Sequence, residues 1–201
     1  MRARTSPVSR RPDWERRRGR ARAMRRILVI GSPGAGKTTL ARRIAAALGL
    51  PLVHLDREYW RPGWVKPADE DWDRQAADLA ERPAWVMDGE YFDSADRLLA
   101  RATAVVWLDL PAWLCLPRAL GRLALNYRKE RPDLAEGCPE YFNRDYVTFI
   151  GDILSYPSRL RPGILARLDG LRPDQDRIVL RSSREVKTFA DGLPSTIAEA
   201  A

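Results

Sequence analysis

The chain contains only two cysteines, Cys115 and Cys138, and one histidine among its 201 residues. Two cysteines do not make a disulfide framework, and with a single histidine they lack the partners that a zinc site requires. No stretch of about 18 residues is continuously apolar, so the sequence predicts no transmembrane helix. A signal-peptide pattern is also absent, and we therefore expect a reduced, cytoplasmic protein with no membrane partner.

Positive charge is concentrated at the start of the chain. Nine arginines stand in residues 1–23 against only Asp13 and Glu15, so this segment carries almost all of the net charge of +8. It has no apolar periodicity, and we expect 1–24 to be a disordered, arginine-rich extension. It could be a nucleic-acid-binding arm, a solvated tail, or sequence ahead of a start at Met24. Because the remainder is nearly neutral, the tail is the only part of the chain through which nucleic acid could bind.

Beyond the tail, short apolar runs alternate with segments of helical periodicity. This alternation indicates βαβ units and predicts an α/β fold: a three-layer sandwich in which helices flank a five-stranded parallel sheet, in one domain over 25–195. Ligands are expected at the carboxyl ends of the strands. Within the last long helical region we expect breaks at Pro157 and Pro162. The expected strands are 25–31, 51–56, 84–89, 104–111 and 177–181, and the expected helices are 38–49, 69–82, 94–102, 112–129, 141–170 and 183–193.

The glycine-rich stretch GSPGAGKT at 31–38 fits the pattern G-x-x-x-x-G-K-[ST] between a strand and a helix. Its glycines let backbone N–H groups turn inward around a phosphate, and the helix dipole points its positive end at the same anion. Lys37 would reach the β- and γ-phosphates, and the Thr38 hydroxyl would bind Mg²⁺. The stretch predicts a site for ATP and Mg²⁺ formed by Gly31, Ser32, Pro33, Gly34, Ala35, Gly36, Lys37, Thr38 and Thr39.

Two other classes of nucleotide-binding protein lack their usual signatures here. A guanine-nucleotide switch needs Asn-Lys-x-Asp, and neither Asn126 nor Asn143 begins that motif. A motor ATPase usually places Glu after the Asp that ends a strand, whereas residues 88–89 are Asp-Gly and residues 109–110 are Asp-Leu. The class that remains after these two is an enzyme that transfers a phosphoryl group to a bound acceptor. That reaction requires water to be excluded and charge to be neutralised, usually by arginines on a closing lid.

Arginines are present where such a lid is expected, at about 122–145. Arg118 and Arg122 are four residues apart and therefore share one helical face. Arg128 and Arg131 follow them, and a solvated basic face explains these two equally well. The Pro-Asp and Gly-Cys-Pro of this stretch indicate a loop of defined conformation.

Candidate acceptor residues follow the second expected strand. Asp56 could orient an acceptor hydroxyl and take its proton, although it could also cap the next turn. His54 is interpreted as a strand residue, because no other soft ligand accompanies it. Trp60 and Trp64 could stack on a base or a sugar, while Trp72 fits better as a buried residue of a helical subdomain.

Two segments resemble adenylate kinases. The P-loop sequence Gly-x-Pro-Gly-Ala-Gly-Lys at 31–37 is similar to that of adenylate kinases, and LDLPAWLCLPRALGR at 108–122 resembles their fourth-strand segment. This resemblance implies that Arg118 lies on the adenine and that Arg122 contacts the transferring phosphate.

Two more segments extend the resemblance. MDGEYF at 87–92 is similar to the third-strand segment of adenylate kinases, which implies that Asp88 holds Mg²⁺ through water. SSREV at 182–186, which includes Arg184, resembles their loop that touches adenine with its backbone.

The acceptor side departs from adenylate kinases. Phe92 stands where they have the arginine that grips the acceptor phosphate, and Arg97 is the nearest replacement. LVHLD at 52–56 is closer to shikimate-kinase-like enzymes, in which an Asp after the second strand binds the acceptor hydroxyl. The core from 26 to about 190 most resembles adenylate-kinase-like P-loop proteins labelled DNA topology modulation proteins, a label that implies little chemistry.

We therefore expect a nucleotide-kinase-like enzyme that moves the γ-phosphoryl group of ATP·Mg²⁺ to a small acceptor: a nucleotide, a nucleoside or a hydroxylated metabolite. The catalytic residues are expected to be Lys37, Arg122 and Asp56, with Thr38 and Asp88 at the metal. The alternative is an ATP-binding regulatory protein that is associated with DNA topology through its basic tail.

Overall fold

The structure, a computed structural model, describes residues 24–89 and 92–194. Its centre is a sheet of five parallel strands in the order β2-β3-β1-β4-β5. The strands are β1 (Arg26–Gly31), β2 (Leu52–His54), β3 (Trp85–Asp88), β4 (Ala104–Leu108) and β5 (Asp176–Leu180). This sheet confirms the expected α/β architecture. The arginine-rich tail lies outside the described residues.

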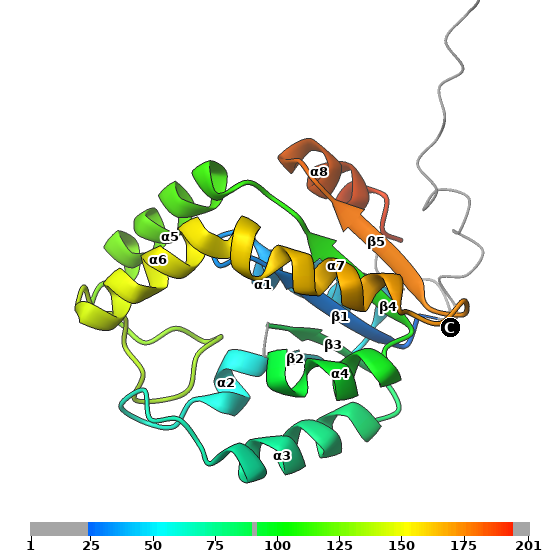
Figure 1. Cartoon of the computed structure of the whole chain (residues 1–201), viewed down its shortest axis with the longest axis horizontal. Helices are drawn as coiled ribbons and strands as arrows, with labels where there is room; N and C mark the ends of the chain where they lie inside the picture. The colour runs from blue at the N-terminus through cyan, green and yellow to red at the C-terminus, as the bar shows by residue number, and fades with distance from the viewer. Residues whose placement is uncertain (1–23, 90–91, 195–201) are drawn as a thin grey trace, which may run out of the picture.

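Helices cover both faces of the sheet (Figure 1). They are α1 (Lys37–Leu48), α2 (Leu55–Tyr59), α3 (Asp69–Glu81), α4 (Phe92–Arg101), α5 (Ala112–Asn126), α6 (Arg144–Arg159), α7 (Arg161–Asp169) and α8 (Ser183–Asp191). Within residues 24–89 and 92–194, no helix combines the length and apolar character that crossing a bilayer requires.

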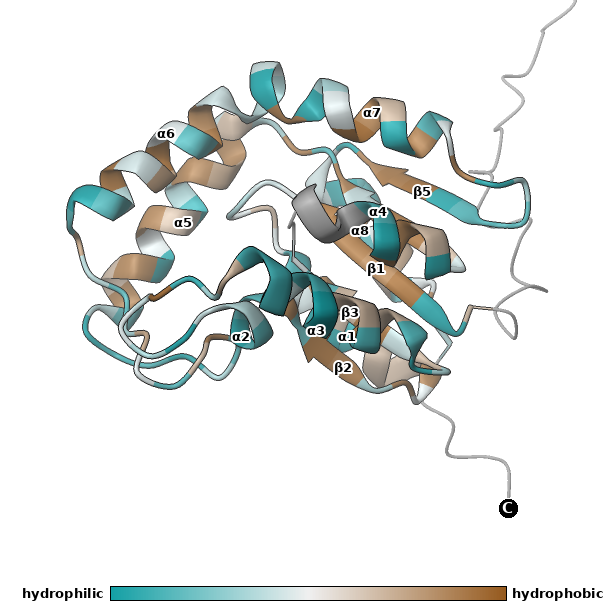
Figure 2. Ribbon diagram, turned by 60° about the horizontal axis from the view of Figure 1, so that its bottom comes forward, coloured by the Kyte–Doolittle hydropathy of each residue, from teal (hydrophilic) through white to brown (hydrophobic). Residues whose placement is uncertain are grey.

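Alternation along the strands divides the core into two halves. Ile27 and Val29 of β1 pack in a cluster with α1, α5 and α8, whereas Leu28 and Ile30 pack in a second cluster with α3, α4 and α7. All four side chains are buried, as expected for a parallel strand covered on both faces. Figure 2 shows this apolar character in the brown strands. The result is the predicted three-layer sandwich.

The second strand is shorter than the sequence suggested. A strand was expected over 51–56, but β2 ends at His54 and α2 begins at Leu55. Leu55 is fully buried, and the acidic residues Asp56 and Glu58 lie in the first helical turn, where negative charge is favourable. Asp56 therefore lies at the start of a helix and not at a strand end.

The expected break at Pro157 is also wrong, since α6 continues through Pro157 to Arg159. The proline lies in the last turn, where the chain leaves the helix two residues later. The break falls at Leu160, and Pro162 occupies the first turn of α7, where its missing N–H costs no helical hydrogen bond.

Helices α5 and α6 run side by side away from the sheet, and the loop 127–143 that joins them extends back toward α2 (Figure 1). This α5–α6 loop occupies the region in which the sequence predicts a lid. Leu134, Ala135 and Cys138 within it are buried. The loop is therefore a packed part of the fold, and both cysteines of the chain are free thiols.

Candidate active site

The glycine-rich turn between β1 and α1 has the backbone of a phosphate cradle. Gly34 has φ +81°, and a Cβ there would lie 2.2 Å from the carbonyl oxygen of Cys115 on α5. At Gly31, with φ +144°, a Cβ would lie 2.6 Å from the carbonyl oxygen of Leu108. The turn therefore packs against α5 and the end of β4 at these two positions, and its positive φ values are those that glycine adopts in a phosphate-binding loop.

Lys37 reaches back over this turn. Its Nζ donates to the carbonyl oxygens of Gly31, at 2.6 Å, and Ser32, at 3.3 Å. Lys37 is the first residue of α1, and these two hydrogen bonds hold its ammonium group beside the start of the loop. This is the place from which a lysine can contact the outer phosphates of a bound nucleotide.

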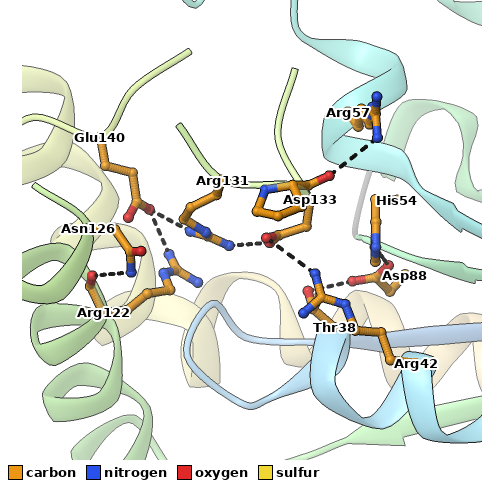
Figure 3. A network of polar contacts seen from close by, with 11 residues as sticks. Thr38, Arg42, His54, Arg57, Asp88, Arg122, Asn126, Arg131, Asp133 and Glu140 are labelled. Atoms are coloured by element: carbon orange, nitrogen blue, oxygen red, sulfur yellow. Dashed lines mark hydrogen bonds and ion pairs between the residues drawn. The ribbon is translucent and has the colours of Figure 1, made fainter. Parts of the chain in front are cut away.

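Thr38, Asp88 and His54 form a chain of contacts beside the loop (Figure 3). The Thr38 hydroxyl donates to Oδ2 of Asp88 at 2.6 Å, and Nδ1 of His54 lies 2.5 Å from Oδ1. Asp88 is buried at the end of β3, and His54 ends the neighbouring strand β2. The structure therefore brings together the two residues that the sequence predicted at the metal.

The donors in this group suit magnesium. A hydroxyl and a carboxylate are hard oxygen ligands, and Mg²⁺ bound with a nucleotide typically takes one or two protein groups, with phosphates and water completing its shell. Within the described ranges, three or more His, Cys, Asp or Glu side chains do not gather as a metal cage. Thr38 and Asp88 are the residues that would hold the ion.

The side chain of Arg118 on α5 reaches the first residue of α8. Its Nη2 donates to Oγ of Ser183 at 3.1 Å, so the two segments compared with the adenine site of adenylate kinases are in contact. Arg184, the next residue, is exposed in the first turn of α8. The side chain that meets Arg118 is therefore that of Ser183.

Arg122 is tied to the α5–α6 loop by an ion pair. Its Nη2 lies 3.3 Å from Oε1 of Glu140, which also accepts a hydrogen bond from Arg131 at 2.7 Å. Glu140 is buried, and its Oε2 and the Nε of Arg122 are buried without hydrogen-bond partners. Arg122 and Arg131 therefore share Glu140 as an internal counter-ion, and Arg131 is not part of a solvated face.

Asp133 extends this network to the P-loop helix. Arg131 donates to its Oδ2, and Arg42 of α1 lies 3.6 Å from Oδ1 (Figure 3). Burial opposes ionisation of this carboxyl, but the hydrogen bond and charge of Arg131, with the charge of Arg42, outweigh it and lower the pKa of Asp133. Two carboxylates thus join α5, α1 and the loop between α5 and α6.

The same loop is bound on its other side to the segment after α2. The indole Nε1 of Trp64 donates to the carbonyl oxygen of Pro139 at 2.9 Å, and the Gly63 N–H donates to the carbonyl of Gly137 at 2.8 Å. The Cys138 thiol lies 3.1 Å from the carbonyl oxygen of Arg61. These contacts fix the α5–α6 loop against the segment that joins α2 to α3.

The aromatic residues of this region pack on one another. Trp60 meets Trp64 edge-on with ring centroids 5.3 Å apart, and Tyr59 meets Trp72 at 5.0 Å. Trp72 is buried in the core, as predicted. Asp56 lies half-buried in the first turn of α2, two residues after His54.

Other acceptor candidates are placed elsewhere or not described. Arg97 of α4 pairs with Asp73 of α3 at 3.6 Å on the surface. Glu90 and Tyr91, which follow Asp88 and Gly89 in the sequence, lie outside the described residues. Sequence reasoning missed the contact between His54 and Asp88, and it missed Asp133 and Glu140 as partners of the arginines. Only knowledge that β2 pairs with β3 could have suggested the contact between His54 and Asp88.

Comparison with known proteins finds similarity to an ATPase family and to a kinase. The family model described as "ATPase family associated with various cellular activities (AAA)" matches residues 27–102, which span the P-loop and less than half of the chain. A protein named shikimate kinase from Corynebacterium diphtheriae is 27% identical over 177 residues, which cover 77% of this chain and 99% of that protein.

Two solved structures have similar folds. The shikimate kinase from Acinetobacter baumannii in complex with shikimate has a TM-score of 0.51 at 20% identity, covering 85% of this chain and 93% of that one. The shikimate kinase from Bacteroides thetaiotaomicron has a TM-score of 0.50 at 18% identity, covering 82% and 93%. At these identities the similarity concerns architecture. The chain therefore has a P-loop kinase fold of the kind found in shikimate kinases.

Proposed function

We propose that this protein is an ATP·Mg²⁺-dependent kinase that transfers the γ-phosphoryl group to a hydroxyl of a small molecule. The observation that carries the proposal is the group at the mouth of the P-loop, where Lys37 caps the loop and Thr38 is bonded to Asp88. A lysine, a hydroxyl and a buried carboxylate in these places match what binding and transfer of a nucleotide phosphate require. The relative named shikimate kinase supports transfer to a small molecule.

Each residue has a role in this proposal. Lys37 and Arg122 would stabilise negative charge on the phosphoryl group during transfer, as donors held in place before the reaction. Arg122 would do so from α5, where Glu140 orients its guanidinium group. Mg²⁺, when bound with ATP, would neutralise part of the phosphate charge. The backbone N–H groups of 31–38 would bind the phosphates.

Asp56 would orient the acceptor and accept its hydroxyl proton. It lies in the first turn of α2, directly after the strand whose end contacts Asp88, and the α5–α6 loop, which is bonded to the segment after α2, would cover this side of the site. A covered site would exclude water, which otherwise competes with the acceptor for the phosphoryl group. Among the acceptor classes expected from the sequence, we favour a hydroxylated metabolite, because the relative and the similar structures are named shikimate kinases.

The test is ADP release from ATP·Mg²⁺ by protein begun at Met24. The assay is run without acceptor, with nucleoside monophosphates, with nucleosides, and with small hydroxylated carboxylic acids. Lys37→Met removes the ammonium group at the P-loop. Lys187→Met is the matched control, since Lys187 is exposed on α8 and pairs with Asp191 at 2.6 Å.

The proposal predicts that one acceptor class stimulates ADP release many-fold, that Lys37→Met abolishes the stimulation, and that Lys187→Met does not. A slow rate that every acceptor leaves unchanged would contradict a kinase. We do not propose a function directed at DNA, because the basic residues that suggested it lie in 1–23, outside the described part of the chain.

A further inference from the structure

His54 and Asp88 face each other across two neighbouring parallel strands. They are register partners at the carboxyl ends of β2 and β3. Nδ1 of His54 lies 2.5 Å from Oδ1 of Asp88, while Oδ2 accepts the Thr38 hydroxyl at 2.6 Å. The side chains of His54 and Asp88 are only 13% and 5% exposed. Both carboxylate oxygens of Asp88 therefore have a partner within the protein (Figure 3).

We propose that His54 is a positioning residue for magnesium, which holds the Asp88 carboxylate so that Oδ2 meets Thr38. The inference rests on the proposed function only in needing ATP and Mg²⁺ at the P-loop. An ionised carboxylate can only accept hydrogen bonds, so Nδ1 of His54 carries the proton in this contact. Hydrogen bonds made by partners behind a metal-binding group orient that group, and losing one typically weakens metal affinity about 10- to 100-fold.

The His54–Asp88 contact also links the residues proposed to hold Mg²⁺ with the segment that carries Asp56. Leu55 follows His54, opens α2 and is fully buried. It packs so closely on Gly89 that a Cβ there would lie 2.7 Å from Leu55 Cβ. The two chain segments thus touch at consecutive positions, 54 with 88 and 55 with 89. Asp56 is the next residue, so the pair that fixes Asp88 also fixes the start of α2, the helix that carries Asp56.

Two substitutions separate the hydrogen bond from the shape of the side chain. In His54→Asn the amide nitrogen stands the same number of bonds from the backbone as Nδ1 and can donate to Asp88. In His54→Leu a methyl group takes that place and donates nothing. His54→Ala removes the donor without adding apolar bulk and is used in addition, in case the leucine variant does not fold.

The experiment measures the binding of Mg²⁺ to protein loaded with a non-hydrolysable ATP analogue, followed as the magnesium-dependent rise in unfolding temperature. A second measurement records the affinity for the same analogue without metal, in EDTA. The unfolding temperature without nucleotide reports whether each variant folds. Neither reading depends on turnover or on the identity of the acceptor.

The proposal predicts that His54→Leu and His54→Ala weaken Mg²⁺ binding about tenfold or more, while His54→Asn stays within about threefold of the wild type. Affinity for the analogue in EDTA should remain unchanged in all three. The proposal is overturned if the leucine and alanine variants bind Mg²⁺ like the wild type, or if the asparagine variant loses as much as they do. Wild-type protein that binds neither nucleotide nor Mg²⁺ would overturn the proposed function as well, and that outcome is distinct from the first two.

Discussion

Trp64 donates from its indole Nε1 to the carbonyl oxygen of Pro139 at 2.9 Å, which joins two segments that lie 75 residues apart in sequence. Trp64 belongs to the connection between α2 and α3, and Pro139 belongs to the α5–α6 loop. With the Gly63–Gly137 hydrogen bond, this contact fixes the loop against the segment between α2 and α3, the side on which we propose that the acceptor binds. The expected lid is thus docked through its backbone.

Trp64→Phe should loosen the loop without unfolding the protein. The variant keeps an aromatic ring but loses the donor, and a neutral hydrogen bond of this kind contributes about 1 kcal/mol. That cost corresponds to a roughly fivefold increase in local opening. We expect trypsin to cleave at the exposed Arg128 and Lys129 about fivefold faster. Trp113→Phe is the control, because Trp113 is 74% exposed on α5, and equal cleavage rates in the two variants would contradict the role of the Trp64 contact.

Asp133 should make stability sensitive to acid. Its pKa is lowered in the folded protein, so its contribution to stability is present above about pH 4, the usual value for an unfolded Asp. The contribution is lost as the pH falls below that value toward the folded-state pKa. Asp133→Asn should lower the free energy of unfolding by about 2 kcal/mol at pH 7, because the carboxylate is hydrogen-bonded to Arg131.

Urea unfolding at pH 7, 5, 4 and 3 measures this dependence. The difference between wild type and Asp133→Asn should be constant from pH 7 to 5 and should shrink at pH 3. Asp174→Asn serves as the control, since Asp174 pairs with Arg172 on the surface and should change stability little at any of these values. A difference for Asp133→Asn that is the same at pH 7 and pH 3 would argue against this ion pair.

The glycines of the P-loop should differ in their tolerance of a side chain. Gly34 and Gly36 both have positive φ, so alanine strains the backbone by about 1 to 2 kcal/mol at either position. At Gly34 the new Cβ would also lie 2.2 Å from the carbonyl oxygen of Cys115, whereas at Gly36 it meets open space. Gly34→Ala should therefore cost about 1 to 3 kcal/mol more than Gly36→Ala. Urea unfolding of both variants without nucleotide measures this, and equal losses would show that the contact with α5 is not rigid.

How far the sequence predicted this molecule depends on how local each feature is. The P-loop was predictable because the glycines, Lys37 and Thr38 act within one turn and the helix that follows it. Strands buried on both faces were predictable because each is a short apolar run. Helix α2 was missed because β2 has only three residues, and the burial of Leu55 against Gly89 decides where the strand ends.

The polar network around Arg122 could not be predicted from the sequence for a related reason. Arg122 was singled out as a site residue, but its partner Glu140 is 18 positions further on, in a loop whose path only the packed structure defines. The contacts of the loop with Trp64 and Arg61 span more than 70 residues. His54 was interpreted as a strand residue, which it is, and its contact with Asp88 follows from a strand pairing that the sequence alone did not reveal.

The nucleotide base should be contacted by the side chain of Arg118 and by the backbone near Arg184. Arg118 is held by Ser183, and a guanidinium group on an aromatic base contributes about 1 kcal/mol, or roughly fivefold in affinity. Arg118→Met should therefore raise the Kd for ATP about fivefold. Arg184→Met should leave it unchanged, because that side chain is exposed and only its backbone is expected at the base. Isothermal titration with ATP analogues measures both, and a larger loss for Arg184→Met would reverse the assignment.

The most direct test of the central claim follows the phosphoryl group itself. Protein begun at Met24 is incubated with γ-³²P-labelled ATP, Mg²⁺ and the acceptor class that stimulates ADP release, and the products are separated. A small-molecule kinase predicts that the label appears on the acceptor in step with ADP, and that Lys37→Met and Asp56→Asn both suppress it. Label that appears only as inorganic phosphate, at a rate that the acceptor does not change, would contradict the account.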